Sequence, residues 1–138
     1  MNPLLQNILK IAAIYNILWG VIQILFPQLF FQVLGMEPTN YPMIWQGMGM
    51  VIGVYGIGYW FASYDYVRHW IIVLVGLAGK VFGPIGYLWN LWTENGQPEF
   101  GYTLLLNDLP WWLPFGWMLW EAWKAGLPIT RDRNLLKK

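Results

Sequence analysis

The chain has 138 residues, of which 57% are hydrophobic and only 11% are charged, with 11 tryptophans and a formal net charge of +1. Because ordinary soluble domains carry roughly 25% charged residues, the composition predicts a single membrane domain, 1–138, and the small net charge gives no indication of a nucleic-acid partner. The absence of cysteine excludes disulfides and thiolate metal sites, and a single histidine, His69, excludes a bis-histidine haem and a multi-histidine metal site.

A first membrane span is predicted over 8–31, with Lys10 at its lower edge, after a short amphipathic lead-in. We expect no cleavable signal, because the N-terminus lacks both an early basic cluster and a small-residue cleavage site before the apolar run. Small and polar residues recur on one face of the span at helical spacing: Asn16, Gly20, Gln23 and Pro27. This stripe is predicted to face inward, with a bend at Pro27, and the Gly- and Pro-containing stretch 34–42 is predicted to be a loop.

The second predicted span, 43–61, is the most glycine-dense part of the chain. One face carries Gln46, Gly49, Gly53, Gly56, Trp60 and Ser63. Gly49 and Gly53 form a GxxxG pair, so we expect this span to pack at close backbone contact against the glycine face of the third span. The short connection 63–69 makes the second and third spans antiparallel neighbours.

The third predicted span, 70–92, is bracketed by tryptophans and is long enough to cross about 30 Å of hydrocarbon. One arc of its helical wheel holds Gly76, Gly79, Lys80, Gly83, Gly86, Tyr87 and Asn90. A charge at mid-membrane is costly, so Lys80 is predicted to point into the protein and to mark a functional site. Pro84 cannot donate to the carbonyl of Lys80, which predicts a kink beside the charge.

The fourth span, within 103–127, has two readings. It either starts near Thr103 and ends near Lys124, or uses Asn107 or Asp108 as its N-cap and ends before Pro128. In both readings Pro114 bends it. A basic tail, 128–138, follows and is predicted to be cytoplasmic.

The distribution of basic residues predicts the threading. All except Lys80 fall at the N-terminus, in the second loop or at the C-terminal end: Lys10, Arg68, Lys124, Arg131, Arg133, Lys137 and Lys138. The first and third loops contain no Lys or Arg, and their charged residues are Glu37, Glu94 and Glu99. By the positive-inside rule both termini are cytoplasmic, which predicts an all-α, up-down, transmembrane four-helix bundle.

Lys80 has two candidate partners on the fourth span. If that span begins near Thr103, Asp108 is buried in the outer half and is the expected partner, while Glu121 pairs with Lys124. If it begins near Leu109, Glu121 lies near the midplane within reach of Lys80. Either pair could be a proton-carrying site at a ligand pocket, or a structural pair that only fixes helix register.

Hydrogen-bonding side chains on the first three spans form a second candidate site: Asn16, Gln23, Gln46, Tyr55, Tyr59, Tyr87 and Asn90. They could bind the head group of a quinone or lipid, although contacts between helices need the same residues and are the commoner outcome. Tryptophans near the span ends are predicted to be interfacial anchors: Trp70, Trp89, Trp92, Trp111, Trp112, Trp120 and Trp123. His69 is predicted to be a solvated loop residue.

Three segments resemble the small bacterial DoxX-like four-helix membrane proteins: IAAIYNILWGVIQILFPQLFFQVLG, WQGMGMVIGVYGIGYWFASYD and NDLPWWLPF. The resemblance covers about 11–115 and includes the segment 79–84, GKVFGP, with the Asn107 and Asp108 pair. It implies a multi-pass bundle in the bacterial inner membrane, and some DoxX-like members are membrane subunits or accessories of redox and sulfur-oxidising systems.

Together these patterns predict an accessory or small hydrophobic ligand-binding protein of the membrane, with its polar site around Lys80. The predicted partners are the lipid bilayer and either further copies of the chain or a membrane complex, such as a redox or respiratory system. No reaction is predicted; the alternative is a membrane oxidoreductase or quinone-reactive subunit that uses Lys80 with Asp108 or Glu121 as a proton relay. No haem or metal site is expected, and quinone and lipid are the candidate ligands.

Overall fold

The computed structural model describes residues 1–93 and 96–127; the predicted basic tail, 128–138, and Glu94 lie outside them. Within this part of the chain the regular structure is helical and contains no strand, as predicted. In chain order the elements are α1 (Pro3–Leu25), α2 (Leu29–Val33), α3 (Pro42–Ala62), α4 (Trp70–Trp92), η1 (Pro98–Phe100), α5 (Gly101–Asn107), η2 (Leu109–Trp111) and α6 (Trp112–Lys124).

Helix α1 begins and ends earlier than predicted. Asn2 caps it, because its side-chain oxygen accepts a hydrogen bond from the Leu4 amide at 3.0 Å, and a proline in the first turn needs no donor. At the other end Pro27 disfavours helical backbone at Phe26, which has φ −131° and ψ 65°. Pro27 therefore ends α1 rather than bending it, and 29–33 forms the separate helix α2.

The close backbone contact made by the glycines of α3 is with α1, not with α4 as predicted. A Cβ added to Gly20 would lie 2.4 Å from the Gly49 carbonyl oxygen, and one added to Gly56 would lie 2.7 Å from the Ala13 carbonyl oxygen. By contrast, nothing lies within 4 Å of a Cβ added to Gly79 on α4. The small residues of α1 and α3 thus allow these two helices to pack together. On α4 an added Cβ would also meet no neighbour at Gly86, whereas at Gly76 it would meet the Tyr59 side chain of α3.

The predicted fourth span is broken at Asp108. Each of its two readings is right in part, since α6 ends at Lys124 as in the first and Asp108 is the N-cap of a turn that contains Pro110 as in the second, but neither predicts a helix that stops at Asp108 and resumes beyond it. Pro110 has no N–H to donate to the Leu106 carbonyl and disfavours helical backbone at Leu109, so α5 ends at Asn107 and a 3₁₀ turn leads into α6. Pro114 lies in the first turn of α6, where no N–H donor is required, and it is not the position of the bend.

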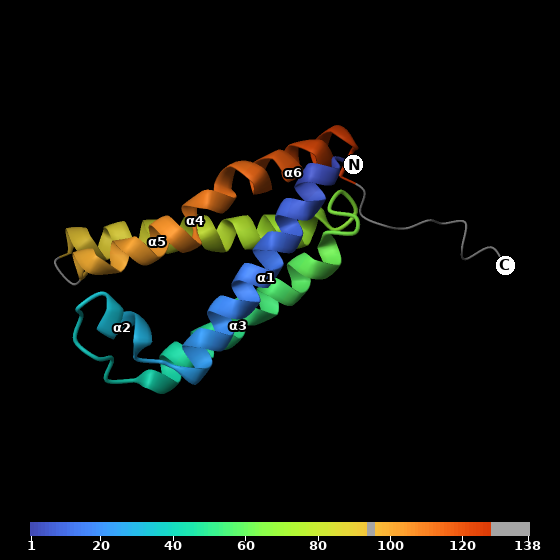
Figure 1. The fold of residues 1–138 in the computed structure, drawn as a ribbon. Helices are drawn as coiled ribbons and strands as arrows, with labels where there is room; N and C mark the ends of the chain where they lie inside the picture. Colours follow the sequence, from blue (N-terminus) through green and yellow to red (C-terminus); the bar gives the residue numbers. More distant parts are fainter. Residues whose placement is uncertain (94–95, 128–138) are drawn as a thin grey trace.

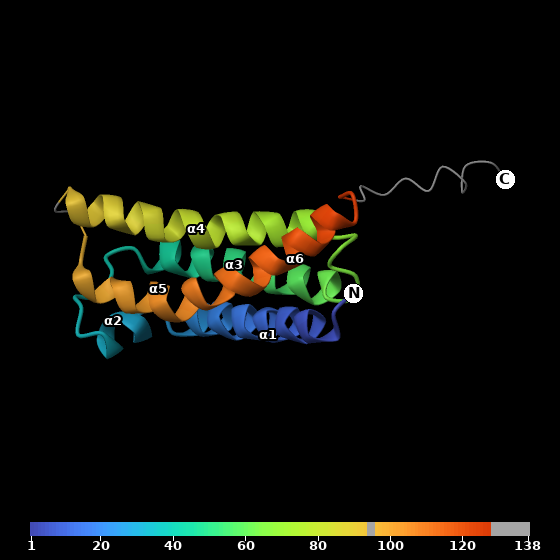
Figure 2. The same cartoon turned by 90° about the horizontal axis from the view of Figure 1, so that it is seen from above.

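The helices form two pairs, α1 with α3 and α4 with the broken α5–α6 segment (Figure 1). The pairs converge at the end that holds the N-terminus and the connection 63–69, and they diverge toward the end that holds α2; Figure 2 shows the same helices side by side from above. The large buried side chains Tyr59, Tyr66 and Phe115, with Leu5 and Leu9, occupy the convergent half. The divergent half is therefore where a cavity can form.

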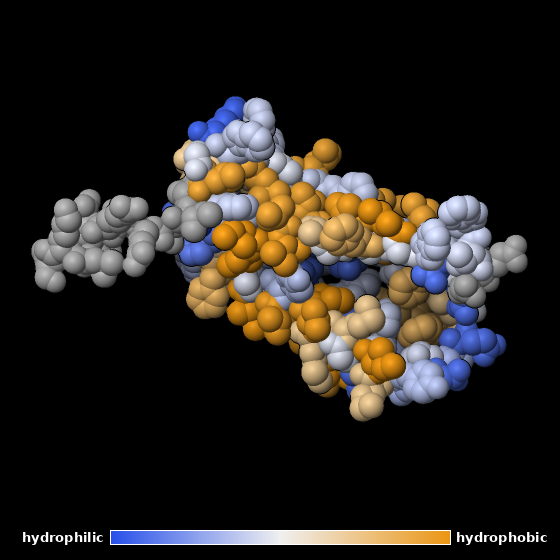
Figure 3. All heavy atoms as spheres, turned by 180° about the vertical axis from the view of Figure 1, so that it is seen from behind, coloured by the Kyte–Doolittle hydropathy of each residue, from blue (hydrophilic) through white to orange (hydrophobic). Residues whose placement is uncertain are grey.

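The outer surface is apolar over the middle of the molecule. Helices α1 and α4 are long and apolar enough to cross a membrane, and only 33% and 22% of their most apolar stretches are buried. On α4 the side opposite the predicted inward arc is exposed, with Phe82 at 68% and Leu88 at 62%. Figure 3 shows hydrophobic residues over most of the visible face and hydrophilic residues toward its two ends.

Candidate functional site

A cavity of about 950 Å³ lies between the two helix pairs. All seven residues of the predicted inward arc of α4 line it: Gly76, Gly79, Lys80, Gly83, Gly86, Tyr87 and Asn90. Residues 36–40 and 96–97 line the cavity at the divergent end, and Figure 3 shows a hollow in the hydrophobic face with hydrophilic residues inside it. The predicted inward arc of the third span therefore borders this cavity, and it meets α3 where Gly76 packs against the Tyr59 side chain.

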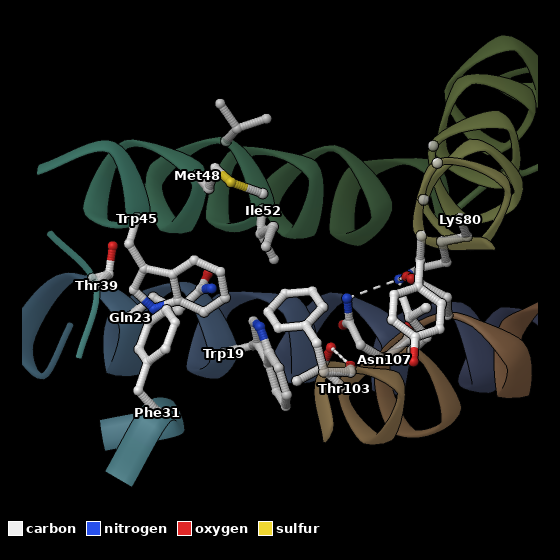
Figure 4. Close-up of a pocket in the computed structure, with 18 of the residues that line it drawn as sticks. Trp19, Gln23, Phe31, Thr39, Trp45, Met48, Ile52, Lys80, Thr103 and Asn107 are labelled. Atoms are coloured by element: carbon white, nitrogen blue, oxygen red, sulfur yellow. Dashed lines mark hydrogen bonds and ion pairs between the residues drawn. The ribbon is translucent and has the colours of Figure 1, made fainter. Parts of the chain in front are cut away.

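Lys80 is buried in the wall of this cavity, with 6% of its surface exposed. Its ammonium Nζ donates to the Asn107 carbonyl at 2.7 Å and lies 3.5 Å from Asp108 Oδ1, and Asp108 is itself only 7% exposed. The amide nitrogen of Asn107 donates to the same Asp108 oxygen at 3.2 Å (Figure 4). Of the two acids predicted as partners, Asp108 is therefore the one that pairs with Lys80.

Two prolines explain how this polar cluster is built. Pro84 leaves the Lys80 carbonyl without its helical donor, and the indole Nε1 of Trp112 donates to that carbonyl at 3.0 Å. Pro110 likewise leaves the Leu106 carbonyl free, and the Tyr15 hydroxyl donates to it at 3.1 Å. The break also frees the next carbonyl, that of Asn107, which is the one that accepts from Lys80.

Glu121 does not contact Lys80. It accepts a hydrogen bond from the Tyr66 hydroxyl at the convergent end, and that hydroxyl also accepts from the Asn2 amide at 2.9 Å. Burial, together with the hydrogen bond to Glu121, raises the pKa of Tyr66 to about 12. Glu121 thus ties α6 to the N-terminus and to the connection 63–69, and the predictions that it pairs with Lys80 or Lys124 are wrong within the described residues.

Most of the second predicted set borders the same cavity. Asn16, Gln23, Tyr55, Tyr59, Tyr87 and Asn90 line it. Gln46 does not; its side-chain amide donates to the Ile24 carbonyl at 2.8 Å and ties α3 to α1. Tyr87 donates to the Pro98 carbonyl at 2.9 Å, and the Asn90 amide donates to the Gly86 carbonyl at 2.8 Å, so these two side chains also bond to the backbone.

Several buried polar atoms of the cavity wall have no hydrogen-bond partner among the described residues. They are the amide oxygens of Asn16, Gln23 and Asn107 and the indole Nε1 of Trp45. A buried polar group without a partner costs about 1–3 kcal/mol, and few are found in folded proteins. Because these four atoms belong to residues that line one cavity, the residues are candidate contacts for a ligand.

Sequence reasoning missed the aromatic walls of the site. Trp19 and Trp45 line the cavity, and Trp45 packs edge-on against Phe31 and Phe100, with ring centroids 5.2 and 5.9 Å apart. Helical spacing could have indicated both residues. Trp19 lies three residues after Asn16 and Trp45 lies four residues before Gly49, so each tryptophan shares a helix face with residues that are predicted to point inward.

The tryptophans near the span ends have mixed roles. Trp89, Trp92, Trp120 and Trp123 are exposed, as anchors would be. Trp111 is only 9% exposed and packs against Tyr15 and Phe115, and Trp112 donates to the Lys80 carbonyl, so these two also belong to the packing of the site. His69 is exposed, as predicted, with its ring Nδ1 2.9 Å from the Asp65 carbonyl oxygen.

Comparisons with known proteins find no family model, no curated protein and no solved structure that matches this chain. The resemblance to DoxX-like proteins therefore stays a prediction. Within 1–93 and 96–127, no group of three His, Cys, Asp or Glu side chains is placed to hold a metal ion.

Proposed function

We propose that this protein spans the membrane four times, with both termini on the cytoplasmic side, and binds a small amphiphilic ligand in the cavity around Lys80. The observation that carries the proposal is the combination of an apolar exterior with a cavity whose wall holds buried, unpaired polar groups. A pocket with mostly apolar walls and a few convergent polar groups is the usual form of a small-molecule site.

The surface supports the membrane part of the proposal. The core helix of a soluble protein would be mostly buried, whereas α1 and α4 leave most of their apolar stretches exposed. Described basic residues near the convergent end are Lys10, Arg68 and Lys124, while the exposed acid Glu37 lies toward the divergent end. This asymmetry favours a cytoplasmic convergent end and a cavity that faces the opposite side of the membrane.

The ion pair supports the site part of the proposal. A lone lysine in a lipid-enclosed interior is unfavourable, but Asp108 and the Asn107 carbonyl together compensate its charge. The pair therefore maintains a polar patch in an apolar cavity. A second candidate, a membrane oxidoreductase or quinone-reactive subunit with a proton relay, is favoured by the position of Lys80 and Asp108 in the cavity wall; a relay through Glu121 lacks that support.

A filling substitution tests the proposal directly. Gly79→Leu would add a side chain to the cavity wall at a position where the new Cβ meets nothing within 4 Å. Gly47→Leu is the matched control, because it too has open space and does not line the cavity. Both substitutions remove a helical glycine, so each should stabilise its helix by up to about 1 kcal/mol.

The readout is native mass spectrometry of protein extracted in a mild detergent. We expect a bound small molecule on the wild type and on Gly47→Leu, and its loss from Gly79→Leu at unchanged or higher thermal stability. A wild type that carries no ligand, or a Gly79→Leu variant that retains it fully, would contradict the proposed site.

A further inference from the structure

We propose that the ligand of this cavity is an uncharged amphiphile whose head group carries several hydroxyls, of the glycerol or sugar type. This inference rests on the proposed function, since it names the class of molecule that the same cavity would hold. Three features of the cavity carry it: its charge balance, its unpaired amides and its opening onto the apolar surface.

The charge balance disfavours an anionic ligand. Among the described residues, the charged side chains that line the cavity are Lys80, Asp108 and Glu37. The charge of Lys80 is already compensated by Asp108. Glu37 is an exposed acid in the segment 36–40, which lines the divergent end of the cavity. An anionic head group would therefore meet no uncompensated cation and would be repelled by Glu37, so a phosphate or carboxylate is a poor occupant.

The unpaired amides favour hydroxyls. Asn16 and Gln23 are 3% and 1% exposed, and they lie seven residues apart on α1, about 10 Å along the helix. Asn107 already uses its amide nitrogen on Asp108, which leaves its oxygen as a free acceptor. A hydroxyl both donates and accepts, so it can pair with a side-chain amide in either orientation, whereas an ester or ether oxygen cannot donate.

The separation of these amides indicates more than one hydroxyl. Figure 4 places Gln23 beside Trp45 at one end of the cavity and Asn107 beside Lys80 at the other, with Trp19 between them. A single hydroxyl cannot reach both ends. A head group with several hydroxyls could pair with amides at more than one position while its carbon skeleton lies against the aromatic walls.

The opening accounts for the apolar part of the ligand. Met48 and Val51 on α3 line the cavity and are also 50% and 57% exposed at the apolar surface. The cavity is therefore continuous with the surface that would face lipid. An acyl chain could leave through this side, and a lipid is accordingly a better candidate than a free sugar or polyol.

A matched set of probes tests the inference on the full chain in a polyoxyethylene detergent, which has few hydroxyls of its own. The probes are 1-oleoylglycerol, methyl oleate, oleate and free glycerol; the first three share one acyl chain. Binding is measured by native mass spectrometry and by tryptophan fluorescence. We expect 1-oleoylglycerol to bind at least about tenfold more tightly than methyl oleate or oleate, because only it can pair the amides without adding charge.

Substitution of the amides provides the second arm. Asn16→Leu and Gln23→Leu should each reduce the preference for 1-oleoylglycerol over methyl oleate. Gln46→Leu, a matched loss of a neighbouring amide outside the cavity, should leave the preference unchanged. If a leucine variant does not fold, the probe series on the wild type still decides.

The outcomes separate this inference from the proposed function. Equal binding of methyl oleate, or tighter binding of oleate, would overturn the hydroxyl class while leaving a ligand site in place. Glycerol that binds as well as 1-oleoylglycerol would support the hydroxyl chemistry and identify a free polyol as its source. No binding of any probe to a protein that also extracts without a ligand would overturn both proposals.

Discussion

Replacement of Asp108 by asparagine should leave Lys80 buried without a counter-charge. At an effective dielectric constant near 20, two charges 3.5 Å apart attract by about 5 kcal/mol, and removal of one partner of a buried pair typically costs about 3–5 kcal/mol. The 3.5 Å separation is longer than an optimal charged hydrogen bond, and the carbonyl of Asn107 would still accept from Lys80. We therefore expect the lower end, a loss of about 3 kcal/mol in the free energy of unfolding.

The double variant, Lys80→Met with Asp108→Asn, removes both charges and should be no less stable than Asp108→Asn, although its Asn107 carbonyl lacks the Lys80 donor, which costs about 1–3 kcal/mol. The assay is reversible unfolding in mixed micelles by titration with a denaturing detergent, followed by helical circular dichroism. Glu37→Gln is the control, because it neutralises an exposed acid of the cavity and should change little. An Asp108→Asn variant that loses less than about 1 kcal/mol would show that Lys80 does not depend on Asp108, and the reasoning on the buried pair would be refuted.

Three further predictions concern helix packing, the hydrogen bond to a free backbone carbonyl, and the dependence of stability on pH. Gly20→Ala should destabilise the protein by about 1–3 kcal/mol in the same unfolding assay, because its Cβ would meet the α3 backbone, whereas Gly47→Ala should be neutral or stabilising. Trp112→Phe should cost about 1 kcal/mol, because the carbonyl of Lys80 loses its donor. The pKa of Tyr66 is raised from 10.0 to about 12, so its contribution to stability is present below pH 10 and is lost as the pH rises toward 12. Tyr66→Phe should therefore lose less stability than the wild type over that interval, as followed by thermal unfolding.

The inward face of α4 could be predicted because two independent signals agree on it. Glycines at helical spacing leave one face of the helix without side chains, and such faces usually lie against other parts of the protein. A charged Lys80 on the same face is unfavourable in contact with lipid. The partner of Lys80 could be narrowed to two acids, Asp108 and Glu121. The sequence does not decide between them, because the choice depends on where the fourth span begins. In the structure, the break that Pro110 causes determines where the fourth span is interrupted. The sequence predicts the bend at Pro114 instead.

The helix partners could not be predicted, because a stripe of small residues indicates close approach without naming the neighbour. Gly49 and Gly56 pack against α1, where Gly20 and Ala13 offer a matching small surface. The glycines of α4 looked equivalent in sequence, yet they line the cavity. The wheel of one helix therefore predicts which residues face inward, but not whether they meet another backbone or an empty space.

The broken helix and the buried lysine depend on each other. Without the break at Asp108, the carbonyl of Asn107 would be paired within a helix, and Lys80 would have only a carboxylate 3.5 Å away. Without Lys80, the same carbonyl would be left without a donor in an apolar interior, which costs about 1–3 kcal/mol. Tyr15 and Trp112 play the corresponding part for the carbonyls freed by Pro110 and Pro84. The two prolines thus create acceptors that the surrounding side chains satisfy, which explains how a chain with an apolar exterior can maintain a charged group beside an open cavity.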